Sequence, residues 1–187
     1  SHIGSATVKL SKVAKKVYAF EPFKSSYDLL TNNLELNHCK NVKTYQKALS
    51  NKNEVGYLGF TGRENPGGTG LIGEELGKPN DTSCEFYEET DENKIDLITL
   101  DSLKLNKLDY IKVDVEGYEK YVILGGLKTI KKCKPILVIE AKGNMKDCKS
   151  ITETQIEIRF KELIDMGYTY KHVEEDDYIF FPNNMEQ

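Results

Sequence analysis

Short runs of apolar residues alternate along the chain with segments in which apolar residues recur three and four positions apart. The runs predict strands over 17–20, 42–46, 55–60, 95–100, 110–115 and 136–139. The wider spacing predicts helices over 7–14, 25–36, 118–130 and 152–166. Two last runs, 168–172 and 178–181, flank an acidic turn and predict a closing antiparallel hairpin. Strands that alternate with helices predict an α/β fold with a mainly parallel sheet.

Length and composition are those of one globular domain. The 187 residues are 39% hydrophobic and 30% charged, which excludes a chain that is disordered throughout. No apolar stretch approaches the ~18 residues of a membrane-spanning helix, and the start of the chain does not resemble a signal peptide. The net charge of −4 weighs against a nucleic-acid partner, because such proteins need a basic face. We expect residues 1–187 to form a single domain.

The 4 cysteines bear on metal binding and on the compartment. None belongs to a C-x-x-C pair, so neither a zinc ribbon nor a redox motif is indicated. They are too sparse for a disulfide scaffold, and we therefore expect reduced thiols in a cytoplasmic protein.

Residues 61–77 are rich in glycine and predict a loop that is long enough to suggest function. A lid over a substrate and a plain surface loop are both open interpretations. The loop lacks the lysine of a phosphate-binding loop, which excludes a nucleoside triphosphatase. The acidic segment 85–92 that follows is expected to be exposed.

Acidic residues stand at the ends of several predicted strands: Glu21, Asp114 with Glu116, and Glu140. In parallel α/β sheets, ligands bind beyond the carboxyl ends of the strands. The pattern therefore predicts a crevice lined by carboxylates at one edge of the sheet.

The first of these carboxylates has two interpretations. Glu21 can accept hydrogen bonds from both hydroxyls of a ribose, because a carboxylate offers two acceptor oxygens. It can also stabilise the start of the next helix. Gly4, just before a predicted helix, would let main-chain amides face an anionic group, although one glycine is a weak signal.

The other carboxylates also allow alternatives. Asp114 and Glu116 can orient a cofactor, accept a substrate proton or hold a divalent cation, or they can belong to a turn in which Glu116 caps a helix. Glu140 can contact a substrate or form a structural salt bridge. Lys112 is expected to neutralise a neighbouring carboxylate.

Successive motifs of the chain, in this order and spacing, resemble those of the FkbM-type S-adenosylmethionine-dependent methyltransferases. The resemblance covers nearly the whole chain, and its most specific part is the pair A-F-E-P and K-V-D-V-E-G-Y-E. The matching segments are 17–22, 33–37, 48–50, 100–103 and 111–119, followed by Gly125-Gly126, Lys134-Pro135 and Ile139-Glu140.

The resemblance implies a class I methyltransferase fold, which is Rossmann-like, and a site for S-adenosylmethionine. It implies that Glu21 binds the ribose and that the methionine end lies near Gly4 and Asp114. The remaining residues that it places at the cofactor are His2, Ser5, Pro22, Phe23, Lys47, Ala48 and Leu49, the last three with Phe23 near the adenine.

Members of this family typically methylate hydroxyl groups, so the resemblance implies O-methylation of a sugar or glycan, with a deoxyhexose favoured. An acceptor oxygen must then be aligned with the carbon–sulfur bond and lose its proton. Asp114 or Glu116 would be the base, and Glu140 would contact substrate. A variant assisted by Mg²⁺ or Mn²⁺ is less favoured. The alternative from another class is a non-catalytic module that binds a nucleotide-like ligand or a partner.

One departure from the family pattern concerns the first residues. The family's glycine-rich loop follows a first strand, whereas this sequence opens inside that loop at Ser1-His2-Ile3-Gly4. Without the strand, two neighbouring strands would expose unpaired backbone groups. We therefore expect further residues upstream in the natural polypeptide, of which this domain would be one part.

Overall fold

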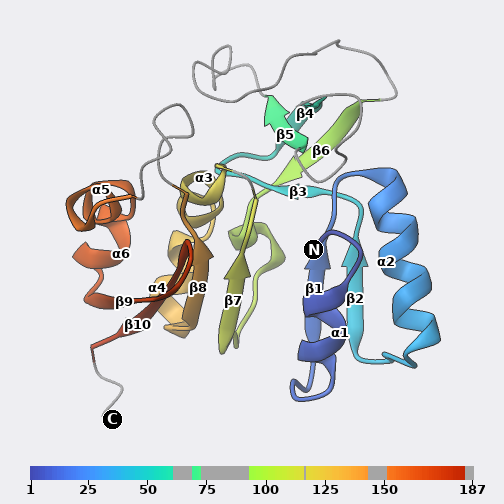
Figure 1. The fold of residues 1–187 in the computed structure, drawn as a ribbon, viewed down its shortest axis with the longest axis horizontal. Coiled ribbons are helices and arrows are strands. Elements are labelled where there is room, and N and C mark those ends of the chain that lie inside the picture. The colour runs from blue at the N-terminus through green and yellow to red at the C-terminus, as the bar shows by residue number, and fades with distance from the viewer. Residues whose placement is uncertain (61–68, 73–92, 116, 143–150, 184–187) are drawn as a thin grey trace.

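The computed structural model describes residues 1–60, 69–72, 93–115, 117–142 and 151–183. Figure 1 shows these residues as strands flanked by helices. The strands form three sheets, with the orders β1-β2, β7-β8-β10-β9 and β3-β6-β4-β5. Within the described ranges no helix has the length and apolarity needed to cross a bilayer.

The first sheet is a parallel pair covered by two helices. β1 (Val17–Phe20) pairs with β2 (Val42–Tyr45), and the chain passes between them through α2 (Lys24–Leu36). α1 (Ser5–Ser11) precedes β1 and contacts it. Alternate residues of β1 point to opposite faces, so Ala19 is buried against Leu30 and Leu34 of α2. These elements confirm the predicted order helix, strand, helix, strand.

The largest core belongs to the sheet β7-β8-β10-β9. β7 (Tyr110–Val113) and β8 (Ile136–Glu140) are parallel, while β10 (Asp177–Pro182) runs antiparallel to both β8 and β9 (Tyr168–Glu174). Every second residue of β8 and β10 is buried, as a half-covered sheet requires. The core holds Leu137, Ile139 and Phe180, with Phe160 edge-on to Phe180 at 5.4 Å between ring centroids.

The third sheet contains two strands, over residues 48–49 and 69–72, that the sequence pattern did not predict. β4 (Glu54–Phe60) pairs antiparallel with β6 (Lys94–Ile98) and with β5 (Thr69–Ile72), and β3 (Ala48–Leu49) pairs parallel with β6. β5 lies inside the predicted loop 61–77, so the prediction of an uninterrupted loop is wrong there. The sequence pattern did not indicate a strand at β5, because this glycine-containing segment becomes a strand by pairing with β4.

Two predicted helices are each interrupted. The predicted helix 118–130 is divided into α3 (Glu119–Leu124) and α4 (Leu127–Cys133) by a glycine pair, which weakens helix formation. The predicted helix 152–166 is divided at Phe160 into α5 (Glu153–Arg159) and α6 (Lys161–Asp165). Phe160 is fully buried in the core, so tertiary packing overrides the local helical period at this residue.

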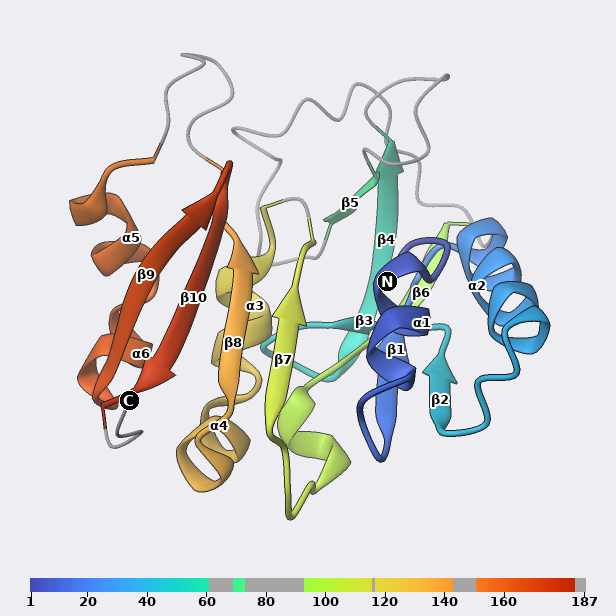
Figure 2. The ribbon, with the colours of Figure 1, turned by 60° about the horizontal axis from the view of Figure 1, so that its bottom comes forward.

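The expectation of one mainly parallel sheet is met only in part. Parallel pairs join β1 to β2, β7 to β8 and β3 to β6, but two of the three sheets also contain antiparallel strands. Among the described strands, β1 pairs only with β2 and β7 pairs only with β8. In Figures 1 and 2, β7 is the strand of its sheet that faces β1, and a gap in the drawn strands separates the two singly paired strands.

The break between α3 and α4 provides a stability prediction. A Cβ at Gly125 would lie 1.9 Å from the carbonyl oxygen of Ser50, a main-chain atom that has little freedom to move. We expect Gly125→Ala to lower the free energy of unfolding by about 3 kcal/mol, the upper end of overpacking effects. Urea unfolding measures this change in the free energy of unfolding. Gly126→Ala is the matched control, because the nearest atoms to its Cβ would be side-chain atoms, of Leu100 at 2.8 Å and of Ile130 at 3.4 Å. Equal losses in both variants would contradict the assignment to the Ser50 contact.

Candidate functional site

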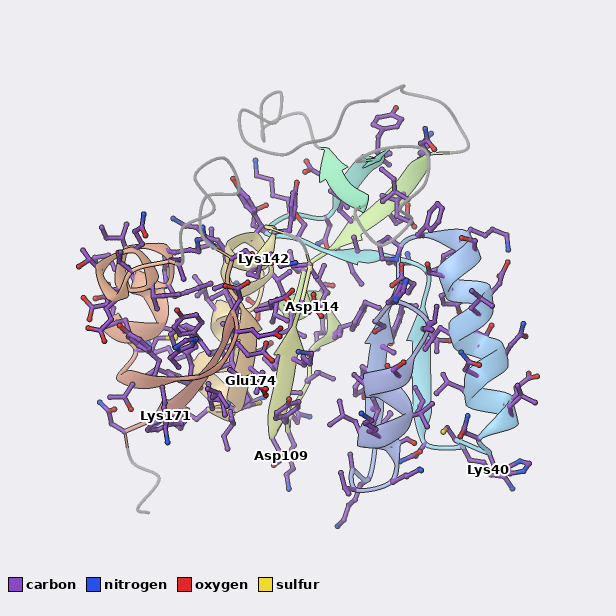
Figure 3. The ribbon with its side chains drawn as sticks, viewed as in Figure 1. Lys40, Asp109, Asp114, Lys142, Lys171 and Glu174 are labelled. Atoms are coloured by element: carbon purple, nitrogen blue, oxygen red, sulfur yellow. The ribbon has the colours of Figure 1, made fainter. Side chains whose placement is uncertain are left out.

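The strand ends that carry the predicted carboxylates lie at one end of the fold. In Figure 1 the arrows of β1, β2, β7 and β8 run in the same direction. Asp114 follows β7 directly, and Figure 3 shows it at the same end as Lys142, which comes just after β8. The structure therefore confirms that the carboxyl ends of these strands share an edge, as the parallel arrangement predicts.

Glu21 is buried at the end of β1, and its carboxylate binds main-chain amides. Only 7% of the residue is exposed. Oε2 accepts a hydrogen bond from the His2 amide at 2.6 Å, and Oε1 accepts one from the Phe23 amide at 3.1 Å. The amine of Ser1 lies 3.4 Å from Oε2. One carboxylate thus connects the segment before α1 to the start of α2.

The segment 1–4 is held against α2 by a close approach and a hydrogen bond. Gly4 has a left-handed backbone, with φ of 96°, and a Cβ there would lie 2.7 Å from Cδ1 of Leu30. Glycine is required at this position because both the backbone angle and the packing exclude a side chain. The Asn33 side chain donates from Nδ2 to the Ile3 carbonyl at 2.8 Å. Ser5 begins α1 and is exposed.

The predicted adenine residues are only partly brought together. Phe23 packs against the cluster that contains Ala48, and its amide binds Glu21, from which Pro22 separates it in the sequence. Lys47 forms an ion pair with Asp96, with 2.9 Å between Nζ and Oδ2. Leu49 packs against the core of the β7 sheet instead. The structure therefore connects Phe23 both to Glu21 and to the cluster of Ala48, whereas Lys47 and Leu49 have other partners.

Asp114 is the exposed carboxylate of the candidate site. Among the described residues its side chain has no hydrogen-bond or ion-pair partner. Its neighbour Lys112 lies 3.6 Å, Nζ to Oδ1, from Asp177, which confirms that Lys112 neutralises a nearby carboxylate. Glu116, the second candidate base, lies outside the described residues, as do the acidic segment 85–92 and most of the predicted lid.

Glu140 ends β8 and forms an ion pair. Its Oε2 lies 3.6 Å from Nζ of Lys142, and both side chains are partly exposed. Its register partner on β10 is Asp177. The contact with Lys142 is the structural salt bridge that the sequence allowed as one of two interpretations. Because this ion pair is partly exposed, the Glu140 carboxylate stays accessible from solvent and can also contact a substrate.

The turn after Asp114 contains two buried polar groups. Gly117 has a φ of 97°, and its amide donates to Oε1 of Glu119 at 2.9 Å. Glu119 is 2% exposed, and burial raises the pKa of its carboxyl above the ordinary value. Tyr118 is also buried, and its hydroxyl has no hydrogen-bond partner in the part of the chain that the structure describes. Burial, with Tyr121 and the charge of Glu54, raises the pKa of that hydroxyl.

A metal site would need several liganding side chains close together. Within the ranges that the structure describes, no group of three His, Cys, Asp or Glu side chains is arranged to bind a metal ion. Cys39 and Cys133 are free thiols.

Sequence reasoning missed the roles of Asn33, Glu119 and Asp101. Each lies inside a motif that resembles the family, but the motif does not say what the side chain touches. Asp101 accepts hydrogen bonds from the amides of Lys128 and Thr129 and from the Thr129 hydroxyl, and so fixes the start of α4 beside η1 (Leu100–Leu103). Asn33 lies three residues from Leu30, and Glu119 lies three residues from Val122, and both apolar residues are buried. A polar side chain on such a helix face is the signal that could have pointed to Asn33 and Glu119.

The anchor between Asn33 and Ile3 provides a binding prediction. If the main chain of residues 2–4 contributes to ligand binding, Asn33→Ala should weaken the affinity for S-adenosylhomocysteine about 5-fold to 10-fold, because a hydrogen bond of this kind contributes ~1 kcal/mol. Isothermal titration measures the dissociation constant. Asn32→Ala, at the exposed neighbouring position of α2, is the matched control. Unchanged affinity in Asn33→Ala would show that the anchor serves folding alone.

Comparisons with known proteins agree with this arrangement. The family model described as the methyltransferase FkbM domain matches residues 2–170. A crystal structure of methyltransferase FkbM from Methylobacillus flagellatus KT has a similar fold, with a TM-score of 0.63 and 17% sequence identity. That likeness covers 96% of this chain but 41% of the other, and at this identity it concerns the fold alone. No curated protein matches the chain. Since the family match spans most of its residues, this chain belongs to the methyltransferase FkbM domain family.

Proposed function

We propose that this chain is an S-adenosylmethionine-dependent O-methyltransferase domain that acts on a hydroxyl group of a sugar or glycan. The observation that carries the proposal is the buried carboxylate of Glu21 at the carboxyl end of β1, beside the main chain of His2. The described partners of this buried carboxylate are the amides of His2 and Phe23 and the amine of Ser1, which lies 3.4 Å from Oε2. A carboxylate has further acceptor positions, which a ligand with paired hydroxyl donors would fill.

The residues at this position fit such a ligand. Each carboxylate oxygen of Glu21 accepts one hydrogen bond from a main-chain amide and retains a second lone pair. A ribose presents two adjacent hydroxyl donors that match these lone pairs. Phe23 packs against the cluster that contains Ala48, and the two residues would offer an apolar surface for a planar base. S-adenosylmethionine would supply an activated methyl group, and Glu21, Phe23 and Ala48 would hold its nucleoside part.

The proposed chemistry at the other side of the site belongs to Asp114 or Glu116. An acceptor hydroxyl becomes a good nucleophile as its proton leaves, so a carboxylate within hydrogen-bond distance of it accelerates transfer. Asp114 is exposed and has no partner among the described residues, so it is available to accept that proton. Glu140 would then contact the acceptor from the neighbouring strand. Carboxylates of this kind could also hold Mg²⁺ or Mn²⁺, which remains the less favoured variant.

We also propose that the class I methyltransferase sheet is completed by a further parallel strand between β1 and β7. The two strands face each other across a gap in the drawn strands, and each has a single partner among the described strands. A strand between them would satisfy the backbone groups of both edges. Such a strand would join the parallel pairs of residues 1–187 into one domain. Free thiols at Cys39 and Cys133 are consistent with action in the cytoplasm.

Calorimetric titration with S-adenosylhomocysteine tests the cofactor proposal. We expect a dissociation constant in the micromolar range for this chain or for a longer polypeptide that supplies the additional strand. Failure of the short chain followed by binding to the longer one would support both the cofactor and the strand. Failure of both would reject the cofactor proposal and favour the non-catalytic module.

Transfer of a labelled methyl group to a panel of acceptors tests the activity. Free sugars and glycans, with deoxyhexoses first, are compared with small aromatic alcohols and with RNA. Labelling of a sugar hydroxyl is the expected result. Cofactor binding without transfer to any acceptor would favour the binding module, while labelling of RNA alone would overturn the proposed acceptor class.

A further inference from the structure

The carboxylate of Glu119 is the most deeply buried charge-bearing group in the part of the chain that the structure describes. Glu119 is 2% exposed and begins α3, three residues beyond Glu116. Glu153 occupies the equivalent first position of α5 but is exposed. A carboxylate in the first turn is stabilised by the helix dipole whether or not it is buried. The burial of Glu119 therefore needs another explanation.

The contacts of Glu119 lie in the turn that carries the candidate base. Its Oε1 accepts the amide hydrogen bond of Gly117 at 2.9 Å, and the amides of Val115 and of Glu119 itself also favour its charged form. Gly117 adopts a left-handed φ of 97°, a backbone conformation that favours glycine. The Glu119 side chain thus binds the amide of a residue three positions after Asp114.

A second interaction of this carboxylate is electrostatic. The positive charge of Arg159, on α5, favours the charged form of Glu119. Arg159 itself donates from Nη1 to the carbonyl oxygen of Lys142 at 3.0 Å. Lys142 follows Glu140 by two residues and forms an ion pair with it. Arg159 therefore connects α5 to the segment after β8.

We propose that Glu119 is a positioning residue that holds the Gly117 amide and so fixes the start of α3 relative to the end of β7. Asp114, which directly follows β7, would then keep its position when an acceptor binds. The inference rests on the proposed function, because it assigns Glu119 a role in orienting the groups that would contact the acceptor. Glu119 itself touches no reacting atom in this proposal.

The energetics distinguish positioning from simple structural support. Burial raises the pKa of Glu119 because its cost to the charged form exceeds the help from the amides and from Arg159. A carboxyl whose folded pKa is raised stabilises the fold below its unfolded pKa, and this contribution is lost as the pH rises through the folded value. At neutral pH the buried charge of Glu119 thus lowers the free energy of unfolding. Replacing it with a neutral side chain of the same shape, as in Glu119→Gln, should not destabilise the protein.

The first test is an NMR titration of the full chain, which needs neither a cofactor nor an acceptor. In the unsubstituted protein, the Gly117 amide proton should shift with a midpoint above 4.5, the ordinary value for glutamate, as Glu119 takes up its proton. Glu119→Gln should abolish this transition and move the amide signal upfield, because a neutral acceptor binds the amide less strongly. Glu153→Gln, at the exposed equivalent position, should change neither. If the chemical shift of the Gly117 amide proton changes neither with pH nor in Glu119→Gln, the proposal is overturned.

The second test compares methyl transfer with stability at neutral pH. We expect Glu119→Ala to lower kcat about 100-fold and Glu119→Gln, which keeps an acceptor oxygen, about 10-fold, as a small displacement of a reacting group can do. The affinity for S-adenosylhomocysteine and the urea midpoint of Glu119→Gln should stay unchanged. A fall in kcat that only follows the loss of folded protein would reject positioning. If the unsubstituted protein transfers no methyl group, the proposed function fails, while the NMR titration still decides whether Glu119 holds the turn.

Discussion

Glu21→Ala should weaken binding of S-adenosylhomocysteine by about 100-fold or more. The loss follows from two hydrogen bonds, one donated by each of the two ribose hydroxyls to the charged carboxylate, which together would contribute ~3 kcal/mol or more. The substitution also leaves the amides of His2 and Phe23 without their acceptor, so the main chain on both sides of the ligand should lose order. Isothermal titration at several temperatures measures the affinity.

Two further variants separate binding from folding. Glu21→Gln keeps an acceptor oxygen for one amide but has no charge, and it should lose an intermediate factor of about 10 in affinity. Glu35→Ala removes an exposed carboxylate from α2 and should bind like the unsubstituted protein. A Glu21→Ala variant that is folded by circular dichroism and still binds with full affinity would contradict the ribose assignment.

Asp114→Asn should lower the rate of methyl transfer about 100-fold to 10,000-fold. The asparagine has almost the same shape, but it cannot take the proton of an acceptor hydroxyl, and general-base catalysis contributes a factor of this size. Because Asp114 is exposed and has no partner among the described residues, the substitution should leave the urea midpoint unchanged. The rate is measured with saturating S-adenosylmethionine and the acceptor found in the screen.

Asp109→Asn is the matched control for this prediction. Asp109 is an exposed aspartate just before β7, and Figure 3 shows it at the opposite end of that strand from Asp114. Its replacement should leave transfer unchanged. If Asp114→Asn transfers methyl groups at the full rate, the base must be another group, and Glu116→Gln becomes the next variant. If Asp114→Asn, Glu116→Gln and the unsubstituted chain all transfer methyl groups at the same rate, neither carboxylate is the base, and this part of the proposal is rejected.

Several features of the fold could be predicted from local patterns. Val17–Phe20 and Ile136–Glu140 are short apolar runs bounded by polar residues, and both form the strands that this pattern predicts. Two long helices, by contrast, were predicted from a spacing that continues through Gly125 and Phe160. The glycine backbone packs on Ser50, and the phenylalanine packs on Phe180. These partners are distant in sequence, so periodicity contains no information about them.

The candidate site was predictable in its charges but not in its contacts. The carboxylates of Glu21, Asp114 and Glu140 could be placed at one edge because strand ends in parallel sheets meet there. Their different environments could not be predicted. Glu21 is buried against amides, Asp114 is exposed, and Glu140 pairs with Lys142. The three carboxylates therefore have three different environments, and each environment suits a different chemical role.

By itself, the sequence determined the order of most helices and strands, the positions of the strand-end carboxylates and the family, because these depend on residues close together or on motifs in a set order. Only the tertiary structure decided that Asn33 holds Ile3, that Glu119 is buried with the Gly117 turn, and that Arg159 reaches the segment after β8. Burial and hydrogen bonding depend on which distant segments meet. That pairing follows from packing of the whole fold, which no local pattern specifies.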